Sequence, residues 1–194
     1  MGGCFFATIR KGNGASVDRP AGIKDGINYT GQSTVTFSLF APGKEFVYLL
    51  GDFNNWRPSS EYLMNRSGRV DSLRFWLEID GLTPGEEYAF QYLVDGEIRI
   101  ADPYSELILD QYNDPYIPES VFPDLKSYPT DKTEHIVGVI FPGKEAYEWQ
   151  AADYVRPAKD ELVIYELLMR DFLATPSYAT LIDTLDYLDR LGIN

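Results

Sequence analysis

The sequence predicts a mainly β fold, in which an antiparallel β-sandwich of immunoglobulin-like type is followed by the start of an α/β unit. Three observations predict it. Several short runs alternate apolar and polar residues, Gly, Pro or Asp turns interrupt them about every 8 to 12 residues, and a later apolar run leads into a helical pattern. Short alternating strands separated by turns are typical of two packed antiparallel sheets.

Alternation between apolar and polar residues defines the strands. Val35, Phe37 and Leu39 occupy one face of the first strand while Thr and Ser occupy the other, which is the period of a half-buried strand. Asp95-Gly96 is a strong signal for a two-residue hairpin. The pattern predicts strands at 34–40, 46–50, 72–79, 87–94, 97–101 and 137–141.

The pattern of apolar and polar residues changes near the end of the sequence. Residues 162–169 are almost continuously apolar, as in a strand buried on both faces of a parallel sheet. Residues 178–191 repeat apolar side chains at helical spacing. Thr175 is the expected N-cap, with Pro176 at the first helical position and Gly192 at the C-terminal cap. Strand, loop and amphipathic helix indicate the first βα unit of a repeating α/β fold.

These patterns divide the chain into four parts. The first is rich in Gly, Ser, Asn and Pro and is expected to be a loose approach segment. The third has many Tyr and Pro residues but is too apolar for a flexible linker, so we expect an ordered connector. The predicted parts are 1–32 (approach segment), 33–110 (sandwich), 111–160 (connector) and 161–194 (incomplete α/β unit).

The charge of the chain limits its partners. The formal net charge is −13 at pH 7, from 30 acidic and 17 basic residues, so phosphate backbones and anionic lipid surfaces are repelled. No run approaches the ~20 apolar residues that a membrane span needs. We therefore expect no nucleic-acid partner and no membrane span, whereas a neutral polysaccharide carries no electrostatic penalty.

Residues suited to catalysis or cofactor binding are scarce. The chain has one cysteine, Cys4, and one histidine, His135, which excludes an internal disulfide, a cysteine-rich metal site and a two-histidine mechanism. His135 lies in a polar loop and is expected to be a solvated surface residue. The sequence has no GxxxxGK[ST] or GxGxxG phosphate loop, and its carboxylates lie mostly in turns or on the polar helix face. We expect no cofactor and no metal.

The N-terminal Gly-Gly-Cys, which ends at Cys4, has two interpretations. It resembles the remnant of a bacterial lipoprotein cleavage site, but we favour a disordered chain end. The first interpretation places the protein in the periplasm or outside the cell, which we favour slightly over the cytoplasm.

The hexapeptide Gly51–Trp56 is the most informative stretch of the chain. It follows the apolar run 46–50, and its Gly, Asp and Asn residues are those that end a strand in a turn. The turn delivers Trp56, whose large flat ring either seals a sandwich core or stacks on the apolar face of a sugar. Both roles stay open from these residues alone. Trp76 and Trp149 are expected to pack against protein.

Two separated sets of residues resemble one enzyme family. Residues 47–56, 92–96 and 101–103 (VYLLGDFNNW, YLVDG and ADP) are similar to the N-terminal sandwich of glycogen-branching enzymes, isoamylases and pullulanases, and to the glycogen-binding module of kinase regulatory β subunits. Residues 162–172 and 178–194 resemble the first strand and helix of the (β/α)8 catalytic barrel of the α-amylase family. The order of the two, sandwich before barrel start, is part of the match.

This resemblance implies an accessory role. In the α-amylase family the catalytic Asp, Glu and Asp residues lie on later barrel strands, and no residue of this chain matches them. The resemblance therefore implies the non-catalytic N-terminal region of a glycoside hydrolase or transferase that acts on starch or glycogen, with the remaining barrel as its structural partner. A stand-alone, weak glycogen- or starch-binding module is the alternative. The barrel-like residues 161–194 argue against a regulatory scaffold.

The same resemblance implies candidate carbohydrate-binding residues. Family modules that bind glucan use a Trp at this turn, a second Trp just after the Asp-Gly hairpin and a nearby Lys. Trp56 matches the first Trp, whereas Ile98 stands at the second and Gln91 at the Lys. The candidates are Trp56, Asn55 and Gln91. Because one platform of two is missing, a structural role for Trp56 is the competing interpretation.

Overall fold

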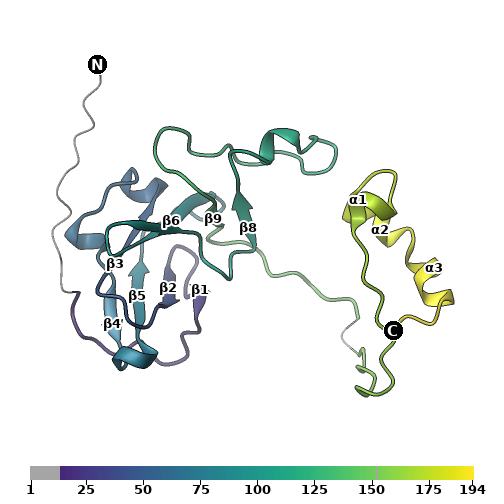
Figure 1. Ribbon diagram of the computed structural model, residues 1–194, viewed down its shortest axis with the longest axis horizontal. Helices are drawn as coiled ribbons and strands as arrows, with labels where there is room; N and C mark the ends of the chain where they lie inside the picture. Colours follow the sequence, from purple (N-terminus) through teal and green to yellow (C-terminus); the bar gives the residue numbers. More distant parts are fainter. Residues whose placement is uncertain (1–13, 152) are drawn as a thin grey trace. The chain divides into compact units, whose positions relative to one another are not determined.

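The computed structural model describes residues 14–151 and 153–194 (Figure 1). Cys4, on which the lipoprotein interpretation rests, lies outside the described residues. The described chain forms two compact units, one with all of its named strands and one with its three α-helices. The first unit holds the chain up to Pro115 together with Lys126–Glu145, and the second holds Tyr116–Leu125 and Ala146–Asn194.

The first unit consists of two antiparallel sheets, which confirms the prediction of a mainly β fold consistent with a sandwich (Figure 1). Sheet A has the strand order β1-β2-β5-β4, and sheet B has the order β3-β6-β9-β8, with β7 also paired to β6. Sheet A contains β1 (Gly26–Tyr29), β2 (Val35–Phe40), β4 (Asn65–Ser67) and β5 (Arg74–Ile79). Sheet B contains β3 (Val47–Gly51), β6 (Tyr88–Val94), β7 (Ile98–Ile100), β8 (Leu107–Leu109) and β9 (Val137–Ile140).

The core is built from alternate residues of the two sheets. Val35, Phe37 and Leu39 of β2, predicted to share one face, are all buried and belong to one apolar cluster with Phe90 and Tyr92 of β6. The rings of Phe37 and Phe90 pack with their centroids 4.9 Å apart. Burial of each such side chain contributes roughly 1.5–3 kcal/mol, so this cluster holds sheet A against sheet B.

Six of the seven predicted strands exist, with ends shifted by at most two residues; the one predicted at 162–169 does not. Three further strands, β1, β4 and β8, are missed by the sequence analysis, and β1 lies within the segment expected to be loose. Each of the three is an edge strand of its sheet. Edge strands are often short and polar, and Asn28 of β1 illustrates this: its side chain donates to the carbonyls of Lys24 and Thr36 at 2.9 and 3.2 Å.

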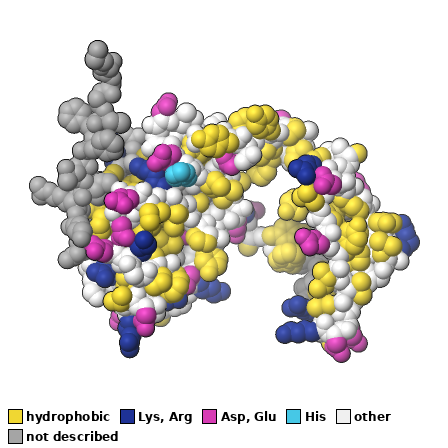
Figure 2. Space-filling view, viewed as in Figure 1, with side chains coloured by type: hydrophobic (Ala, Val, Ile, Leu, Met, Phe, Trp, Pro, Cys, Tyr) yellow, Lys and Arg dark blue, Asp and Glu magenta, His cyan; other side chains and the backbone are white. Residues whose placement is uncertain are grey.

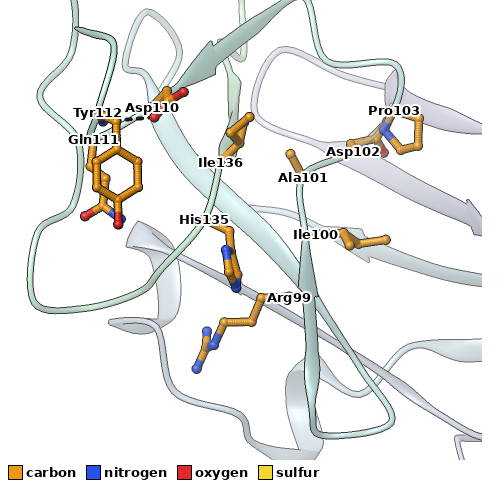
Figure 3. Close-up of a pocket in the computed structure, with 10 residues that line it drawn as sticks. All are labelled: Arg99, Ile100, Ala101, Asp102, Pro103, Asp110, Gln111, Tyr112, His135 and Ile136. Carbon is orange, nitrogen blue, oxygen red and sulfur yellow. Dashed lines mark hydrogen bonds between the residues drawn. The ribbon is translucent and has the colours of Figure 1, made fainter.

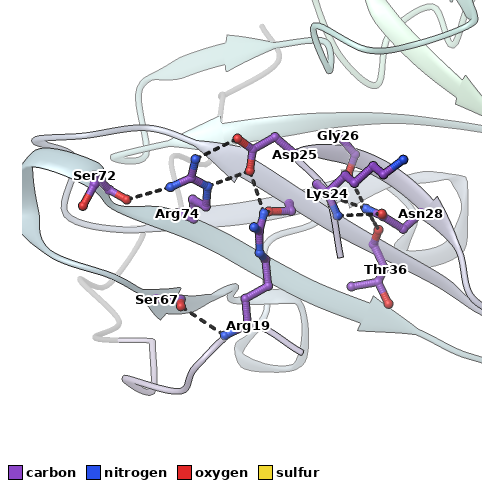
Figure 4. Close-up of polar contacts among 10 residues, drawn as sticks. Arg19, Lys24, Asp25, Gly26, Asn28, Thr36, Ser67, Ser72 and Arg74 are labelled. Carbon is purple, nitrogen blue, oxygen red and sulfur yellow. Dashed lines mark hydrogen bonds and ion pairs between the residues drawn. The ribbon is translucent and has the colours of Figure 1, made fainter. Parts of the chain in front are cut away.

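An ion-pair network holds the chain before β1 against sheet A (Figure 4). Asp25 accepts hydrogen bonds from Arg74 Nε at 2.7 Å and Nη2 at 3.0 Å, and from Arg19 Nη1 at 2.6 Å. Arg19 Nη1 also donates to Ser38 Oγ of β2 at 2.9 Å. The hydrogen bond from Arg74, joined by that from Arg19, lowers the pKa of Asp25 against the opposing effect of burial. Two-pronged arginine–carboxylate pairs are among the stronger hydrogen bonds.

The second unit carries three short helices: α1 (Met169–Phe172), α2 (Tyr178–Ile182) and α3 (Leu185–Arg190). Residues 162–168 form no strand, contrary to the prediction. A strand needs a neighbour for its backbone N–H and C=O groups, and Val163 bonds instead to Asn194, whose Oδ1 accepts from Val163 N at 3.0 Å. None of the helices in the described residues is long and apolar enough to cross a membrane.

The helix predicted over 178–191 is interrupted between α2 and α3. Its apolar residues Ile182, Leu185 and Leu191 are at least half exposed, and helices this short are marginal without a packed face. Ser177 rather than Thr175 is the N-cap.

Residues at both ends of the stretch 177–193 form helix caps. Ser177 Oγ accepts from Thr180 N at 3.2 Å. Gly192, predicted as the C-terminal cap, has a φ of +77°. Its N–H donates to Asp189 O at 2.8 Å and the following Ile193 N–H donates to Leu188 O at 3.3 Å, which is the Schellman pattern that favours glycine.

Candidate functional site

The hexapeptide Gly51–Trp56 forms the turn that the sequence predicts. A 3₁₀ helix, η1 (Asp52–Asn54), follows β3 directly. The side-chain oxygen of Asn54 accepts a hydrogen bond from Gly51 N at 3.0 Å. A Cβ atom at Gly51 would lie 2.7 Å from the carbonyl oxygen of Ala89 in the neighbouring strand, so this position needs glycine for space.

Trp56 is buried within this turn. Only 4% of it is exposed, and its indole Nε1 donates to Asp52 Oδ1 at 3.0 Å. The second oxygen of Asp52 accepts from Ala89 N at 2.9 Å and forms an ion pair with Lys126 at 3.3 Å. Trp56 has a φ of +60°, an uncommon conformation for a bulky residue. The ring thus fills a position that the surrounding turn and β6 define.

Gln91 marks the point at which β6 changes its neighbour. Residues Tyr88–Phe90 pair with β9, whereas Tyr92–Val94 pair with β7. Sheet B therefore splits into two branches at Gln91. Its side-chain amide donates to the carbonyls of Glu134 and Ile136, at 2.9 and 3.0 Å, so the side chain bonds the backbone just before β9, where the strand ladder has ended.

Residues 126–136, called here the covering segment, lie against the outer face of sheet B around Gln91. Thr133 Oγ1 donates to Gln91 Oε1 at 2.6 Å, and Arg99 Nη1 donates to Thr133 Oγ1 at 3.2 Å. Lys126 adds the ion pair to Asp52. The side chains of β3 and β6 on this outer face are buried: Tyr48, Leu50, Ala89, Gln91 and Leu93. Both faces of the central strands of sheet B are therefore covered.

The three predicted carbohydrate-binding residues have different surroundings. Gln91 has no exposed area and Trp56 almost none, while Asn55 is exposed. Neither Trp56 nor Gln91 offers a surface to a sugar in this conformation, so their role in binding stays a prediction that requires the turn or the covering segment to move.

The structure confirms the expectations for Trp76 and His135 but not the one for Trp149. Trp76 packs as expected, with its indole N–H donating to Val17 O at 2.9 Å, and His135 is exposed as expected. The expectation of a packed Trp149 is wrong: it is 78% exposed and contacts the ring of Tyr147 edge-on, with centroids 5.0 Å apart. Trp149 lies in a segment without regular structure, which gives its ring no sheet or helix face to pack on.

A pocket of about 530 Å³ opens where sheet B splits, and we call it the fork pocket (Figure 3). Three segments line it: β7 with the chain that leaves it, the chain leaving β8 and the chain entering β9. The sequence analysis misses this pocket. The three segments are distant in the sequence and come together only because β6 pairs with β9 before Gln91 and with β7 after it, and no sequence pattern marks this exchange. The lining residues are Arg99, Ile100, Ala101, Asp102, Pro103, Asp110, Gln111, Tyr112, His135 and Ile136.

The two carboxylates of the fork pocket are held by their own turns. Asp110 accepts from Tyr112 N at 2.9 Å, and this hydrogen bond is the largest cause that lowers the pKa of Asp110. Asp102 is buried and accepts from Tyr92 Oη at 2.6 Å and Tyr104 N at 2.7 Å. Burial raises the pKa of Asp102 and raises that of Tyr92 well above its ordinary value.

Comparison with known proteins finds a family model that matches part of the first unit. Residues 25–105 match carbohydrate-binding module 48, the isoamylase N-terminal domain. Over 163 residues the chain is 26% identical to malto-oligosyltrehalose trehalohydrolase of Saccharolobus solfataricus. The aligned region covers 82% of this chain and 22% of the relative.

Two solved structures share the fold. One is a Salmonella typhimurium protein assigned as an alpha amylase (TM-score 0.54, 21% identity, 88% of this chain and 23% of that chain). The other is the catalytic module of SpuA, a glycogen-degrading pneumococcal virulence factor (TM-score 0.50, 19% identity, 88% of this chain and 26% of that chain). The chain thus spans about a quarter or less of the length of these proteins. Residues 25–105 thus match carbohydrate-binding module 48, and the proteins to which the chain is similar are α-amylase-family enzymes.

Proposed function

We propose that this chain is the N-terminal accessory region of a glycoside hydrolase or transferase that acts on α-glucans such as starch or glycogen. The observation that carries the proposal is the family match of residues 25–105, a module type that occurs at the N-terminus of isoamylases. The similarity to the trehalohydrolase extends beyond the module, over 82% of this chain, which supports a common arrangement of module and following segment.

Residues 161–194 are, on this proposal, the first strand and helix of a (β/α)8 barrel. Their exposed apolar side chains support it: Ile164 is 82% exposed, and Val163 and Leu168 are about half exposed. Figure 2 shows hydrophobic side chains across the visible face of this unit, at the right of the view. Apolar surface of this extent is typical of a face that another part of a protein covers, and neighbouring barrel strands would supply the missing partners of 162–168.

The chain itself is proposed to be non-catalytic. Glycoside hydrolysis in this enzyme class needs two facing carboxyl groups at a sugar-binding cleft. In the fork pocket, Asp102 is buried and directs its carboxylate to Tyr92, while Asp110 is held in its own turn. Neither is placed as a free acid and base pair.

A hydrolysis assay tests this proposal. The purified 194-residue chain is incubated with amylose, and new reducing ends are measured against a parallel reaction with an active α-amylase. We expect no release above the buffer control. Release that scales with the concentration of the chain contradicts the non-catalytic assignment.

A stand-alone, weak starch- or glycogen-binding module is the second candidate function. The first unit favours it because the unit has a closed apolar core of its own and matches, over residues 25–105, a carbohydrate-binding module family. Sedimentation with insoluble starch tests it: the second candidate predicts retention of the chain, and a chain that stays entirely in the supernatant contradicts it.

A further inference from the structure

We propose that the fork pocket binds the end of a neutral α-glucan chain or a short oligosaccharide of one to three sugar rings. The inference rests on the proposed function for the kind of sugar, and on the geometry of the pocket for its place. It moves the expected sugar contact away from Trp56 and Gln91, which are buried, to residues that the sequence analysis did not select.

The pocket has the dimensions of a small-ligand site. Its volume of about 530 Å³ falls within the roughly 300–1,000 Å³ that ligand pockets span. Residues of three chain segments line it (Figure 3). A pocket of this volume suits a chain end or a short oligosaccharide better than a long stretch of polymer.

The walls combine apolar surface with one exposed aromatic ring. Ile100, Ala101, Pro103 and Ile136 supply the apolar part. Tyr112 is 74% exposed, and its ring lies at the opposite side of the pocket from Ile100 and Ala101 (Figure 3). A sugar ring has an apolar face that stacks on such a ring, and Tyr112 offers the flat surface that the buried Trp56 does not.

The polar groups of the pocket select a neutral ligand. Arg99 uses Nη1 for Thr133, and within the described residues no carboxylate pairs with its guanidinium or with the imidazole of His135. Both side chains lie at one wall (Figure 3). Asp110 stands at another wall with a lowered pKa, so it repels an anion, while Arg99 repels a cation. Hydroxyl groups both donate and accept hydrogen bonds, and a polyol therefore satisfies donors and acceptors together.

Calorimetric titration of the 194-residue chain with maltotriose tests the inference. We expect saturable binding that weakens about fivefold or more in Tyr112→Ala, since one stacking contact is lost, and measurably in Arg99→Gln and His135→Asn. Asparagine at 135 tolerates the φ of +68°. The matched controls are Tyr147→Ala, which removes an equally exposed ring, and Arg69→Gln, which removes an exposed arginine; both should bind as the parent chain does.

Three results would overturn the inference. The first is no saturable binding of maltotriose, and the second is equal affinity in Tyr112→Ala, Arg99→Gln and His135→Asn with the fold intact by circular dichroism. The third is displacement of maltotriose by inorganic phosphate, which would show that the pocket binds anions. None of these results concerns the release of reducing ends, so the non-catalytic assignment is tested independently by the hydrolysis assay.

Discussion

The indole N–H of Trp56 donates to Asp52 Oδ1 across 3.0 Å, and the second oxygen of the same carboxylate accepts the backbone N–H of Ala89 at 2.9 Å. One carboxylate therefore ties the tryptophan ring to strand β6. Lys126 adds the covering segment to this junction through its ion pair with Asp52. The turn that resembles a sugar-binding motif is, in this structure, a corner that joins β3, β6 and the covering segment.

Replacement of Trp56 by alanine should destabilise the first unit. Removal of a buried Trp side chain leaves a cavity and costs about 3–5 kcal/mol, and Asp52 loses the indole donor. Urea unfolding followed by far-ultraviolet circular dichroism measures this cost. Trp149→Ala is the control, because that ring is exposed and its loss should change the free energy of unfolding by less than about 0.5 kcal/mol. Equal effects of the two substitutions would contradict the corner role.

Asp25 should make the stability of the first unit depend on pH. The folded state lowers its pKa below the ordinary value of 3.8, chiefly through Arg74, so the folded protein binds this proton less readily than the unfolded chain does. The stabilisation is complete above the unfolded pKa and is lost as the pH falls through the folded pKa. Asp25→Asn should therefore cost most near pH 6 and progressively less below about pH 4.

Paired urea titrations of the parent chain and Asp25→Asn from pH 6 downwards measure this difference. Asp71→Asn is the control, because Asp71 pairs with Arg69 at an exposed site where ion pairs contribute little. A difference between the parent chain and Asp25→Asn that stays constant across the range would contradict the role given to Arg74.

Gln91→Leu should loosen the covering segment. The substitution leaves the partly buried carbonyls of Glu134 and Ile136 without the amide that bonds them. A hydrogen bond of this kind contributes about 0.5–1.5 kcal/mol. Hydrogen exchange of the amides at 133–137 should accelerate more than exchange in β2. Gln150→Leu, at an exposed position, is the matched control. Unchanged exchange over 133–137 would contradict the anchoring role of Gln91.

The sequence predicts the parts of the fold whose pattern is local. Alternation, apolar runs and turn residues locate six strands of the two sheets, because burial leaves a local pattern in the sequence. It does not locate β1, β4 and β8, whose stability comes from pairing at a sheet edge rather than from their own residues. It fails at 162–168, where apolar composition predicts a strand but the described chain supplies no neighbouring strand.

The site is harder to predict than the fold because it depends on contacts between distant segments. The motif singles out Trp56 and Gln91 and leaves a structural and a sugar-binding role for Trp56 open. The contacts that bury the two side chains, with Asp52 and the covering segment, come from residues distant in the sequence or outside the motif's pattern. Arg99, Tyr112 and His135 carry no motif in common. They line one pocket only because β6 pairs with β9 before Gln91 and with β7 after it.

The state of Trp56 in solution tests the corner role most directly. A variant with Trp76→Phe and Trp149→Phe leaves Trp56 as the sole tryptophan, and its fluorescence can be followed while acrylamide or maltotriose is added. The structure predicts blue-shifted emission, weak quenching by acrylamide and no response to maltotriose. Red-shifted emission that acrylamide quenches readily and maltotriose protects would show Trp56 to be a sugar platform and would contradict the structural role assigned to it.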